Sequence, residues 1–277
     1  MSLPLIHIPT LHRYSRNDPN DVRMGEIISF VEHDLPVIKP GDVCLIGFPE
    51  DRGVARNYGR SGASDGPDRV KEMFYRLPAS NYQFGLKNFS KFSLFDFGNI
   101  DTGNSLDEAQ SRLGNVIAWV LHREGIPVVI GGGHETAYGH FLGYVETRKP
   151  VSVLNFDAHL DLREVPADGI GTSGSPFRQM IEHPSGLLER YGVSGIQPNA
   201  NSVDYLDYAI ANKVKFSWLS ELNGHDFHLE NLLIPEDDTV YVTIDIDGFS
   251  VQHAPGCSAP QVIGFNPERM LPLMLEL

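Results

Sequence analysis

Residues 152–161 read SVLNFDAHLD, a largely apolar run that leads without a break into Asp157, His159 and Asp161. A short run of this kind is typical of a strand that is covered on both faces, as in a parallel sheet. In open sheets of parallel strands, ligands bind outside the carboxyl ends of the strands. This stretch therefore predicts a layered α/β fold and a functional site at the end of one strand.

Six further apolar runs lie on either side of this stretch, and helical patterns separate most of them. The expected strands are 43–48, 92–97, 128–130, 152–156, 193–196, 214–219 and 240–246. The expected helices start at Gly66-Pro67, at Ser105 (a capping box whose helix runs to Gly125) and at Asn266-Pro267, and cover 178–190 and 202–212. This alternation predicts an α/β fold, with a mostly parallel sheet between two layers of helices, as a single domain over residues 1–277.

Two other expected strands end in residues of the same chemical kind. The three glycines at 131–133 bring His134 to the end of one strand, and Asp245 and Asp247 lie at the end of another. Alternate residues of an extended segment point to the same side. We therefore expect Asp245 and Asp247 to share one face, and the three polar residues of the first stretch to share another.

Together these six residues offer four carboxylates and two imidazoles, and no thiolate. The predicted metal ligands are His134, Asp157, His159, Asp161, Asp245 and Asp247. Clustered carboxylates raise one another's pKa unless cations neutralise them, so the set predicts two divalent ions. Oxygen and imidazole ligands favour manganese, and iron, cobalt or zinc would also suit them. Each motif alone is more often a loop, a turn or a helix cap, and it is their combination that favours a metal site.

Two divalent ions predict a hydrolase, because a water molecule that they share loses a proton near neutral pH and becomes a nucleophile. Asp161 can accept a hydrogen bond from that nucleophile and carry a proton to a leaving nitrogen. Asp161 and its neighbour His159 are the predicted catalytic residues. No Gly-x-Ser-x-Gly motif directly follows an expected strand, as a nucleophile elbow would, and no reactive-cysteine signature is visible, which argues against a nucleophile from the protein.

Composition narrows the class of partner. The formal net charge is −14, which argues against a nucleic acid as partner and leaves a small-molecule substrate. Cys44 and Cys257 are the two cysteines, and we interpret both as free thiols in a reducing compartment. No secretion signal and no apolar run long enough to span a membrane are visible, so we expect a cytoplasmic protein with no membrane partner.

The motifs Gly-Gly-Gly-His, Asp-Ala-His-x-Asp and Asp-x-Asp, in this order, resemble those of the ureohydrolases: arginase, agmatinase and formimidoylglutamase. Residues 57–67, NYGRSGASDGP, are also similar to the N-terminal loop of that family. The resemblance implies a three-layer α/β/α fold with a mostly parallel, eight-stranded sheet, a binuclear manganese site and a homo-oligomer. It assigns His134, Asp157, Asp161 and Asp245 to one ion, and Asp157, His159, Asp245 and Asp247 to the other, with Asp157 and Asp245 bridging.

Three segments are most like formimidoylglutamase: 172–179, 195–198 and 254–260. Phe177 stands where arginases place a histidine that assists proton transfer, which disfavours arginase. Arg163 is predicted to pair with a substrate carboxylate, and Ser173 and Ser175 to add hydrogen bonds to the substrate. The alternative for Arg163 is an ion pair on the surface.

The resemblance thus favours hydrolysis of N-formimidoyl-L-glutamate to L-glutamate and formamide. Alternatives are another ureohydrolase activity, on arginine, agmatine or a guanidino acid, and a catalytically silent member that serves as a binding or assembly subunit. Relatives continue into a last strand and helix beyond the point where this chain stops, at Leu277. We therefore expect a fold that lacks these two elements, either as a short gene product or as a truncated form.

Overall fold

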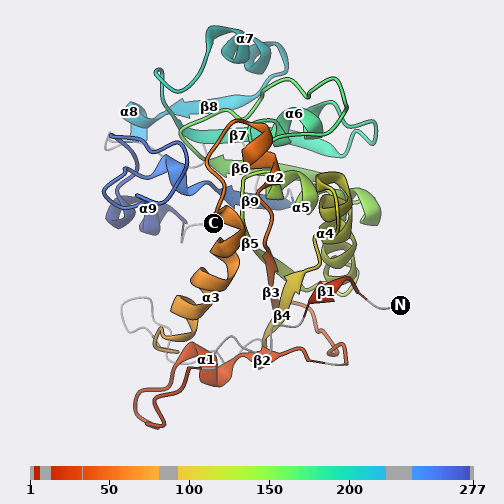
Figure 1. Ribbon diagram of the computed structural model, residues 1–277, viewed down its shortest axis with the longest axis vertical. Coiled ribbons are helices and arrows are strands. Elements are labelled where there is room, and N and C mark those ends of the chain that lie inside the picture. Colours follow the sequence, from red (N-terminus) through yellow and green to blue (C-terminus); the bar gives the residue numbers. More distant parts are fainter. Residues whose placement is uncertain (1–2, 7–13, 33, 81–92, 223–238, 275–277) are drawn as a thin grey trace. The chain divides into compact units, whose positions relative to one another are not determined.

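The structure is a computed structural model that describes residues 3–6, 14–32, 34–80, 93–222 and 239–274 (Figure 1). It divides into two compact units. The first unit comprises Met1–Asp51 and Gly62–Thr147, and the second unit comprises Arg52–Ser61 and Arg148–Leu277. Each unit contains its own sheet, and the organisation as a single domain stays a prediction.

The sheet of the first unit is mostly parallel. Its described strands are β1 (Leu5–Ile6), β2 (Ser29–Phe30), β3 (Val43–Phe48), β4 (Leu94–Ile100) and β5 (Ile126–Gly131). The order is β1-β4-β3-β5, with β2 also paired to β4. Only β1 runs antiparallel to its neighbour among these strands. The expected strands at 43–48, 92–97 and 128–130 correspond to β3, β4 and β5, and Phe92 lies outside the described residues.

Helices cover both faces of this sheet. They are α1 (Met24–Ile27), α3 (Gly66–Tyr75), α4 (Leu106–Leu121) and α5 (Thr136–Thr147), with a short 3-10 helix η1 (Ala63–Asp65) before α3. Figure 1 shows α3 on one side of β3 and β5, and α4 and α5 on the other. Ser105 accepts a hydrogen bond from the Glu108 amide, which confirms the expected cap. The helix ends at Leu121 rather than near Gly125, because Glu124 takes a positive φ of 58°.

A buried ion pair fastens α3 to β4. Lys71 is fully buried, and its Nζ lies 2.7 Å from Oδ1 of Asp96. The other carboxylate oxygen, Oδ2, accepts a hydrogen bond from the hydroxyl of Tyr75. Burial lowers the pKa of Lys71, against the opposing effect of Asp96. A buried cation with a buried partner of this kind fixes the position of the helix, because either charge alone would be costly.

The sheet of the second unit is entirely parallel. It contains β6 (Val151–Phe156), β7 (Leu188–Ile196), β8 (Lys215–Trp218) and β9 (Val240–Ile244), in the order β8-β7-β6-β9. These strands confirm the four that were expected from the sequence in this region. The helices of this unit are α2 (Arg52–Arg56), α6 (Pro176–Ile181), α7 (Val203–Ala211), α8 (Leu219–Leu222) and α9 (Pro267–Met274).

The helix expected over 178–190 is confirmed only over 178–181 and is wrong from residue 182 onward. Helix α6 ends at Ile181, and β7 already begins at Leu188. Pro184 disfavours helical backbone at the residue before it, and Gly186 has a φ of +63°, so the chain turns there. By contrast, α7 matches the expected helix at 202–212, and Asn266 caps α9 by accepting a hydrogen bond of 2.8 Å from the Glu268 amide.

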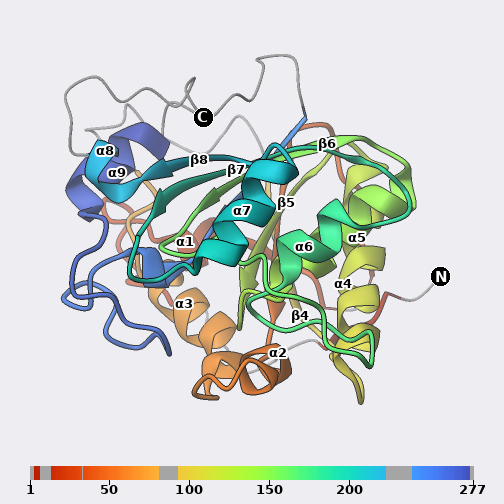
Figure 2. The ribbon, with the colours of Figure 1, turned by 90° about the horizontal axis from the view of Figure 1, so that it is seen from above.

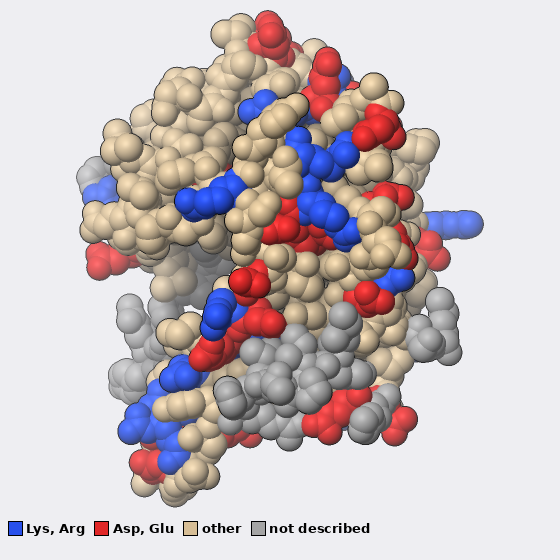
Figure 3. Space-filling model, in the orientation of Figure 1, with Lys and Arg blue, Asp and Glu red and all other residues tan. Residues whose placement is uncertain are grey.

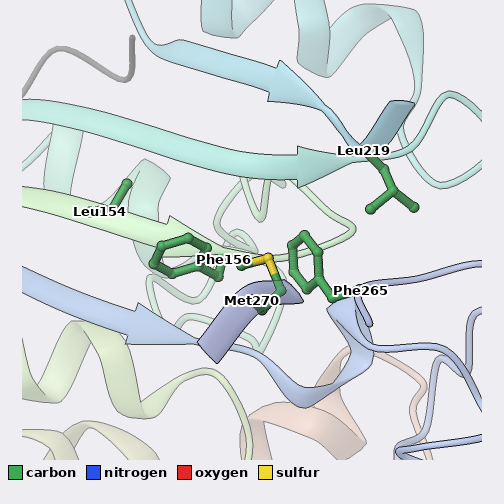
Figure 4. Close-up of a cluster of buried hydrophobic side chains, with 5 residues drawn as sticks. All are labelled: Leu154, Phe156, Leu219, Phe265 and Met270. Carbon is green, nitrogen blue, oxygen red and sulfur yellow. The ribbon is translucent and has the colours of Figure 1, made fainter. Parts of the chain in front are cut away.

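The central strand β6 is buried along its whole length, as its apolar sequence predicted. One face carries Leu154 and Phe156, which pack with Leu219, Phe265 and Met270 (Figure 4). The opposite face carries Asn155, beside Tyr191 of β7. Phe177 of α6 stacks on that tyrosine with 4.3 Å between ring centroids, and Figure 2 shows α6 and α7 over the same sheet. The second unit therefore has helices on both faces of a parallel sheet.

Charges of both signs lie interspersed on the face that Figure 3 shows. Within the described residues, every helix is too short or too polar to cross a membrane.

Candidate metal centre

Asp157 directly follows β6 and is fully buried. Its backbone amide donates to the Ser194 carbonyl at 3.0 Å, which continues the pairing with β7. Its Oδ1 accepts a hydrogen bond of 2.8 Å from the His159 amide, and its Oδ2 accepts one of 3.1 Å from the side chain of Asn155. Each carboxylate oxygen is thus held by one donor, which fixes the orientation of the group.

The end of β9 repeats this design. The Asp245 amide donates to the Phe156 carbonyl at 2.9 Å, so β9 stays paired with β6 up to this residue. Oδ1 of Asp245 then accepts a hydrogen bond of 2.9 Å from the amide of Asp247, two residues on. Aspartate side chains commonly bond to the backbone two residues on in this way, and the bond turns the chain. Here it opens the 3-10 helix η3 (Ile246–Gly248).

Strand alternation is therefore the wrong reason for the clustering, although the residues do meet. Neither segment is an extended strand at the ligands: β6 ends at Phe156, and β9 ends at Ile244 rather than at Ile246. Asp161 has a φ of +48°, which is rare for residues other than glycine. Two aspartate-capped turns, rather than strand alternation, bring the side chains together.

In the second unit, the ligand atoms of Asp157, Asp161 and Asp245 lie within 4.8 Å of one another. Those of Asp157, His159 and Asp247 form a second group within the same limit. Asp157 belongs to both groups, as expected for a bridging ligand. This donor set of carboxylates and one imidazole suits hard divalent cations, so the residues fit two such ions.

His159 presents its Nδ1 to the carboxylates. This atom lies 3.3 Å from Oδ1 of Asp157 and 3.3 Å from Oδ2 of Asp247. Burial lowers the pKa of His159, but hydrogen bonds to these two aspartates outweigh it and raise the pKa to about 11. Burial and the charges of Asp245 and Asp157 raise the pKa of Asp247 to about 9. Negative charge from neighbouring aspartates contributes to both shifts, and a cation would neutralise it.

His134 lies in the first unit, between β5 and α5, where the sequence placed it. A glycine is needed at position 132, because a Cβ there would lie 2.0 Å from the Glu50 carbonyl oxygen. The amide of Gly133 donates to that same oxygen at 2.9 Å. These contacts shape the loop that presents His134 at the carboxyl end of β5. Its role as a metal ligand stays a prediction from the resemblance.

Two supporting residues were not predicted. Asn155 contacts Asp157, as described, and also the hydroxyl of Tyr191, which in turn donates to the Leu160 carbonyl at 3.0 Å. The signal for Asn155 was present, since it is an amide two residues before Asp157 in a strand that is otherwise mostly apolar. No sequence signal pointed to Gln261, whose Nε2 lies 3.5 Å from Nε2 of His159.

The ring of Phe265 packs against the backbone near Asp157 and forms the floor of the metal centre. A Cβ on Gly195, which has a φ of +97°, would lie 2.1 Å from this ring, and one on Gly248 would lie 2.6 Å from it. The ring also meets Phe156 and Phe249 edge to face. Two glycines therefore let an aromatic ring approach the backbone that carries the ligands.

The predicted substrate residues lie in the loop between β6 and α6. Arg163 is exposed, and its Cζ lies 5.8 Å from the centroid of the Tyr205 ring. The surface ion pair that was its alternative is absent from the described part of the chain. Ser173 is half-buried and accepts a hydrogen bond of 3.2 Å from the Asn57 side chain. Ser175 is fully buried, and its hydroxyl bonds to Thr172 within the loop, so its substrate role stays a prediction that this burial disfavours.

Comparison with known proteins decides the family. A family model, Arginase, matches residues 41–277. The chain belongs to the Arginase family. The formimidoylglutamase of Rhodococcus jostii (strain RHA1) is 36% identical to it over 242 residues, which are 83% of this chain and 72% of that protein. The formimidoylglutamase of Streptococcus gordonii is 36% identical over 261 residues, which are 88% and 76% of the two chains.

Solved structures agree with this assignment. The crystal structure of Trypanosoma cruzi formiminoglutamase with Mn²⁺ is similar at a TM-score of 0.80 and 30% identity, over 90% of this chain and 83% of that chain. The formimidoylglutamase of Bacillus subtilis is similar in fold, with a TM-score of 0.81. Membership of the Arginase family confirms the predicted ureohydrolase resemblance and α/β class. The chain is a metal-dependent hydrolase that acts on C–N bonds.

Proposed function

We propose that this Arginase-family chain is a binuclear manganese hydrolase that converts N-formimidoyl-L-glutamate and water into L-glutamate and formamide. The observation that carries the proposal is the pair of ligand groups that share Asp157, in a chain whose relatives are formimidoylglutamases. His134, from the end of β5, completes the first group in this proposal. Asp245, which lies in the first group, would be the second shared ligand.

Two manganese ions, when bound, supply Lewis acidity and activate water. The protein contributes fixed ligand geometry. Asp157 has both carboxylate oxygens held by donors, so it can bridge without reorienting. Asp245 has one oxygen held by the Asp247 amide. Such preorganised groups need no rearrangement during the reaction.

Asp161 is the group that we assign to proton transfer. Its positive φ departs from the course of the strand, and its carboxylate lies with those of Asp157 and Asp245. Strained backbone of this kind persists where the surrounding structure fixes it, commonly at functional sites. From this position Asp161 would take a proton from the attacking water and pass it to the leaving nitrogen. His159 would assist as a ligand that orients the same water.

Arg163 and Ser173 are the proposed contacts to the glutamate part of the substrate. An arginine fork pairs with a carboxylate through two parallel hydrogen bonds, and the substrate offers two carboxylates. Agmatine offers none, so Arg163 favours the glutamate derivative. Phe177, where arginases place a histidine, is fully buried against Tyr191, so this position packs the core and has no role in proton transfer.

The test is release of formamide and L-glutamate from N-formimidoyl-L-glutamate by manganese-loaded protein. Arginine, agmatine and a guanidino acid, assayed beside it, separate the other ureohydrolase activities. We expect the highest kcat/KM for the formimidoyl substrate, at least about tenfold above that for agmatine, which offers Arg163 no carboxylate. Preference for one of the others would contradict the substrate. A silent assembly subunit would turn over none of them.

We further propose that the protein is cytoplasmic and forms a homo-oligomer, with no nucleic-acid or membrane partner. The composition supports the location, with its two buried free cysteines. Light scattering after size-exclusion chromatography measures the assembly, and a mass of 30.8 kDa, that of one chain, would contradict the oligomer.

A further inference from the structure

Residues Arg52–Ser61, which we call the clamp, belong to the second unit although most of that unit lies after residue 147. The clamp consists of α2 and the turn that follows it. It contacts two loops: the β6 loop, residues 157–175, and the β9 loop, residues 249–266. Arg56 and Arg60, four residues apart, make the main polar contacts, one to each loop.

Arg56 holds the β6 loop through four hydrogen bonds. Its Nη2 donates to both carboxylate oxygens of Asp168 at 2.8 Å and to the Ile170 carbonyl at 3.0 Å, and its Nε donates to the Gly171 carbonyl at 3.1 Å. The hydrogen bonds from Arg56 lower the pKa of Asp168, so the carboxylate stays charged. A lysine cannot reproduce this planar fork of donors.

Two further contacts tie the same loop to the clamp. The Ser173 amide donates to the Gly53 carbonyl at 3.0 Å, and Asn57 donates to the Ser173 hydroxyl at 3.2 Å. The loop then closes on itself, because the Arg163 amide donates to the Gly174 carbonyl at 2.9 Å. The clamp therefore contacts the backbone of Ser173 directly, and that of Arg163 indirectly through the Arg163–Gly174 hydrogen bond.

Arg60 holds the β9 loop. Its Nη2 donates to the carbonyls of Gly256 and Cys257, both at 2.9 Å. A Cβ on Gly59 would lie 3.1 Å from the Ser258 hydroxyl, so the backbone of the clamp lies close to a side chain of this loop there. Farther along this loop, Gln261 reaches His159, at the metal centre.

We propose that Arg56 and Arg60 are positioning residues: they set the two loops that border the metal centre, so that Arg163, Ser173 and Gln261 stand ready before substrate binds. The kinetic part of this proposal rests on the proposed function. Rigid loops reduce the ordering cost of binding, so loss of either arginine should weaken substrate binding more than it slows the chemical step.

The experiment uses the full chain loaded with manganese. Arg56→Met, Arg56→Lys and Arg60→Met are compared with Arg69→Met, which removes an arginine whose exposed partner is Glu72 on α3. Amide hydrogen exchange of Ile170 and Ser173 reports the β6 loop. Maleimide labelling of Cys257, relative to the fully buried Cys44, reports the β9 loop. KM, kcat and the bound manganese content are also measured for each variant.

In Arg56→Met, exchange at Ile170 and Ser173 should rise about tenfold while labelling of Cys257 stays unchanged, because local opening follows the contacts that were lost. Arg60→Met should give the reverse pattern. In each, KM should rise about tenfold with kcat within about twofold and manganese content intact, and Arg56→Lys should fall between Arg56→Met and wild type. Arg69→Met should match wild type.

Exchange and labelling rates equal to wild type would overturn the proposal, and so would a fall in kcat at constant KM. Where Arg56→Met does not fold, Arg56→Lys and Arg60→Met decide by the same readouts. If wild type releases no formamide, the proposed function fails, and the exchange and labelling rates alone decide whether the clamp positions the loops.

Discussion

The side-chain amide of Asn155 donates a hydrogen bond of 3.1 Å to Oδ2 of Asp157, the carboxylate that both ligand groups share. Since Oδ1 is held by the His159 amide, the orientation of the bridging group depends on one side chain and one turn. Asn155 itself is fully buried and bonded to Tyr191, so it is rigid. Residues behind metal ligands commonly fix both their orientation and their basicity.

Asn155→Leu removes this donor while keeping a buried side chain of similar size. We expect manganese affinity to fall about 10- to 100-fold, the range typical of lost support behind a ligand. Isothermal titration calorimetry with manganese measures this affinity. Ser217→Ala, which removes a buried polar group elsewhere in the same sheet, serves as control. Equal affinity in Asn155→Leu and wild type would show that Asp157 needs no support from the strand.

Gly174→Ala tests the placement of Arg163. An added Cβ would lie 2.7 Å from Cδ of Arg163 and 2.9 Å from Nδ2 of Asn57, so both side chains must move. We expect KM to rise about tenfold with a smaller change in kcat, because misplacement affects binding of the substrate carboxylate first. Gly256→Ala is the matched control, since nothing lies within 4 Å of its added Cβ. Similar values of KM in the two variants would show that Arg163 does not contact the substrate.

His140 predicts a pH dependence of stability in the first unit. It is buried in α5, and burial lowers its pKa from 6.5 to about 3. As pH falls below 6.5 the unfolded chain takes up the proton first, so the free energy of unfolding falls by at most ~1.4 kcal/mol per pH unit until about pH 3. This stability is fully present above pH 6.5.

Urea unfolding between pH 7.5 and pH 5 measures this dependence. His140→Gln should flatten it, whereas His122→Gln, at an exposed position at the end of α4, should leave it as in wild type. The same slope in His140→Gln and wild type would show that this histidine is not the group responsible.

Phe265→Ala should loosen the floor of the metal centre. Removing a buried phenylalanine ring typically costs about 3–5 kcal/mol, and here the cavity would open beneath Asp157. We expect both a lower free energy of unfolding and weaker manganese binding. Phe216→Ala, at a half-buried ring on β8, should lower stability with no loss of manganese affinity. Unchanged manganese affinity in Phe265→Ala would show that the Phe265 ring does not help to position the ligands.

Much of this could be predicted from the sequence because buried parallel strands have a distinctive composition. The run before Asp157 is apolar because both faces of β6 are covered, and ligand residues follow because strand ends gather at one edge of the sheet. The structure brings together the residues that the sequence placed at these strand ends, Asp157, His159, Asp161, Asp245 and Asp247, and their role as ligands stays a prediction.

The local geometry could not be predicted in the same way. Strand alternation was extended past Phe156 and Ile244, where the side chains of Asp157 and Asp245 instead bind the backbone two residues on. Such side chain–backbone hydrogen bonds compete with regular secondary structure. Residue type alone does not show whether the strand continues or the turn forms. The helix expected over 178–190 failed for a related reason, because a turn at Pro184 outweighs the propensity of the residues around it.

Contacts between distant segments had no sequence signal. Arg56 meets Asp168 across 112 positions, and Arg60 meets Cys257 across 197. Any exposed arginine and aspartate form an equally plausible pair before the fold brings them together. The clamp was therefore visible only in the structure.

The central claim is that this chain holds two manganese ions through its shared aspartates. The most direct measurement is the metal content of the protein after loading with manganese and exhaustive dialysis, for wild type, Asp157→Ala and Asp247→Ala. We predict two ions per chain in wild type, about one or fewer in Asp247→Ala, and none in Asp157→Ala, because Asp157 belongs to both ligand groups. Wild-type protein that retains fewer than two ions, or Asp157→Ala that retains both, would contradict the account.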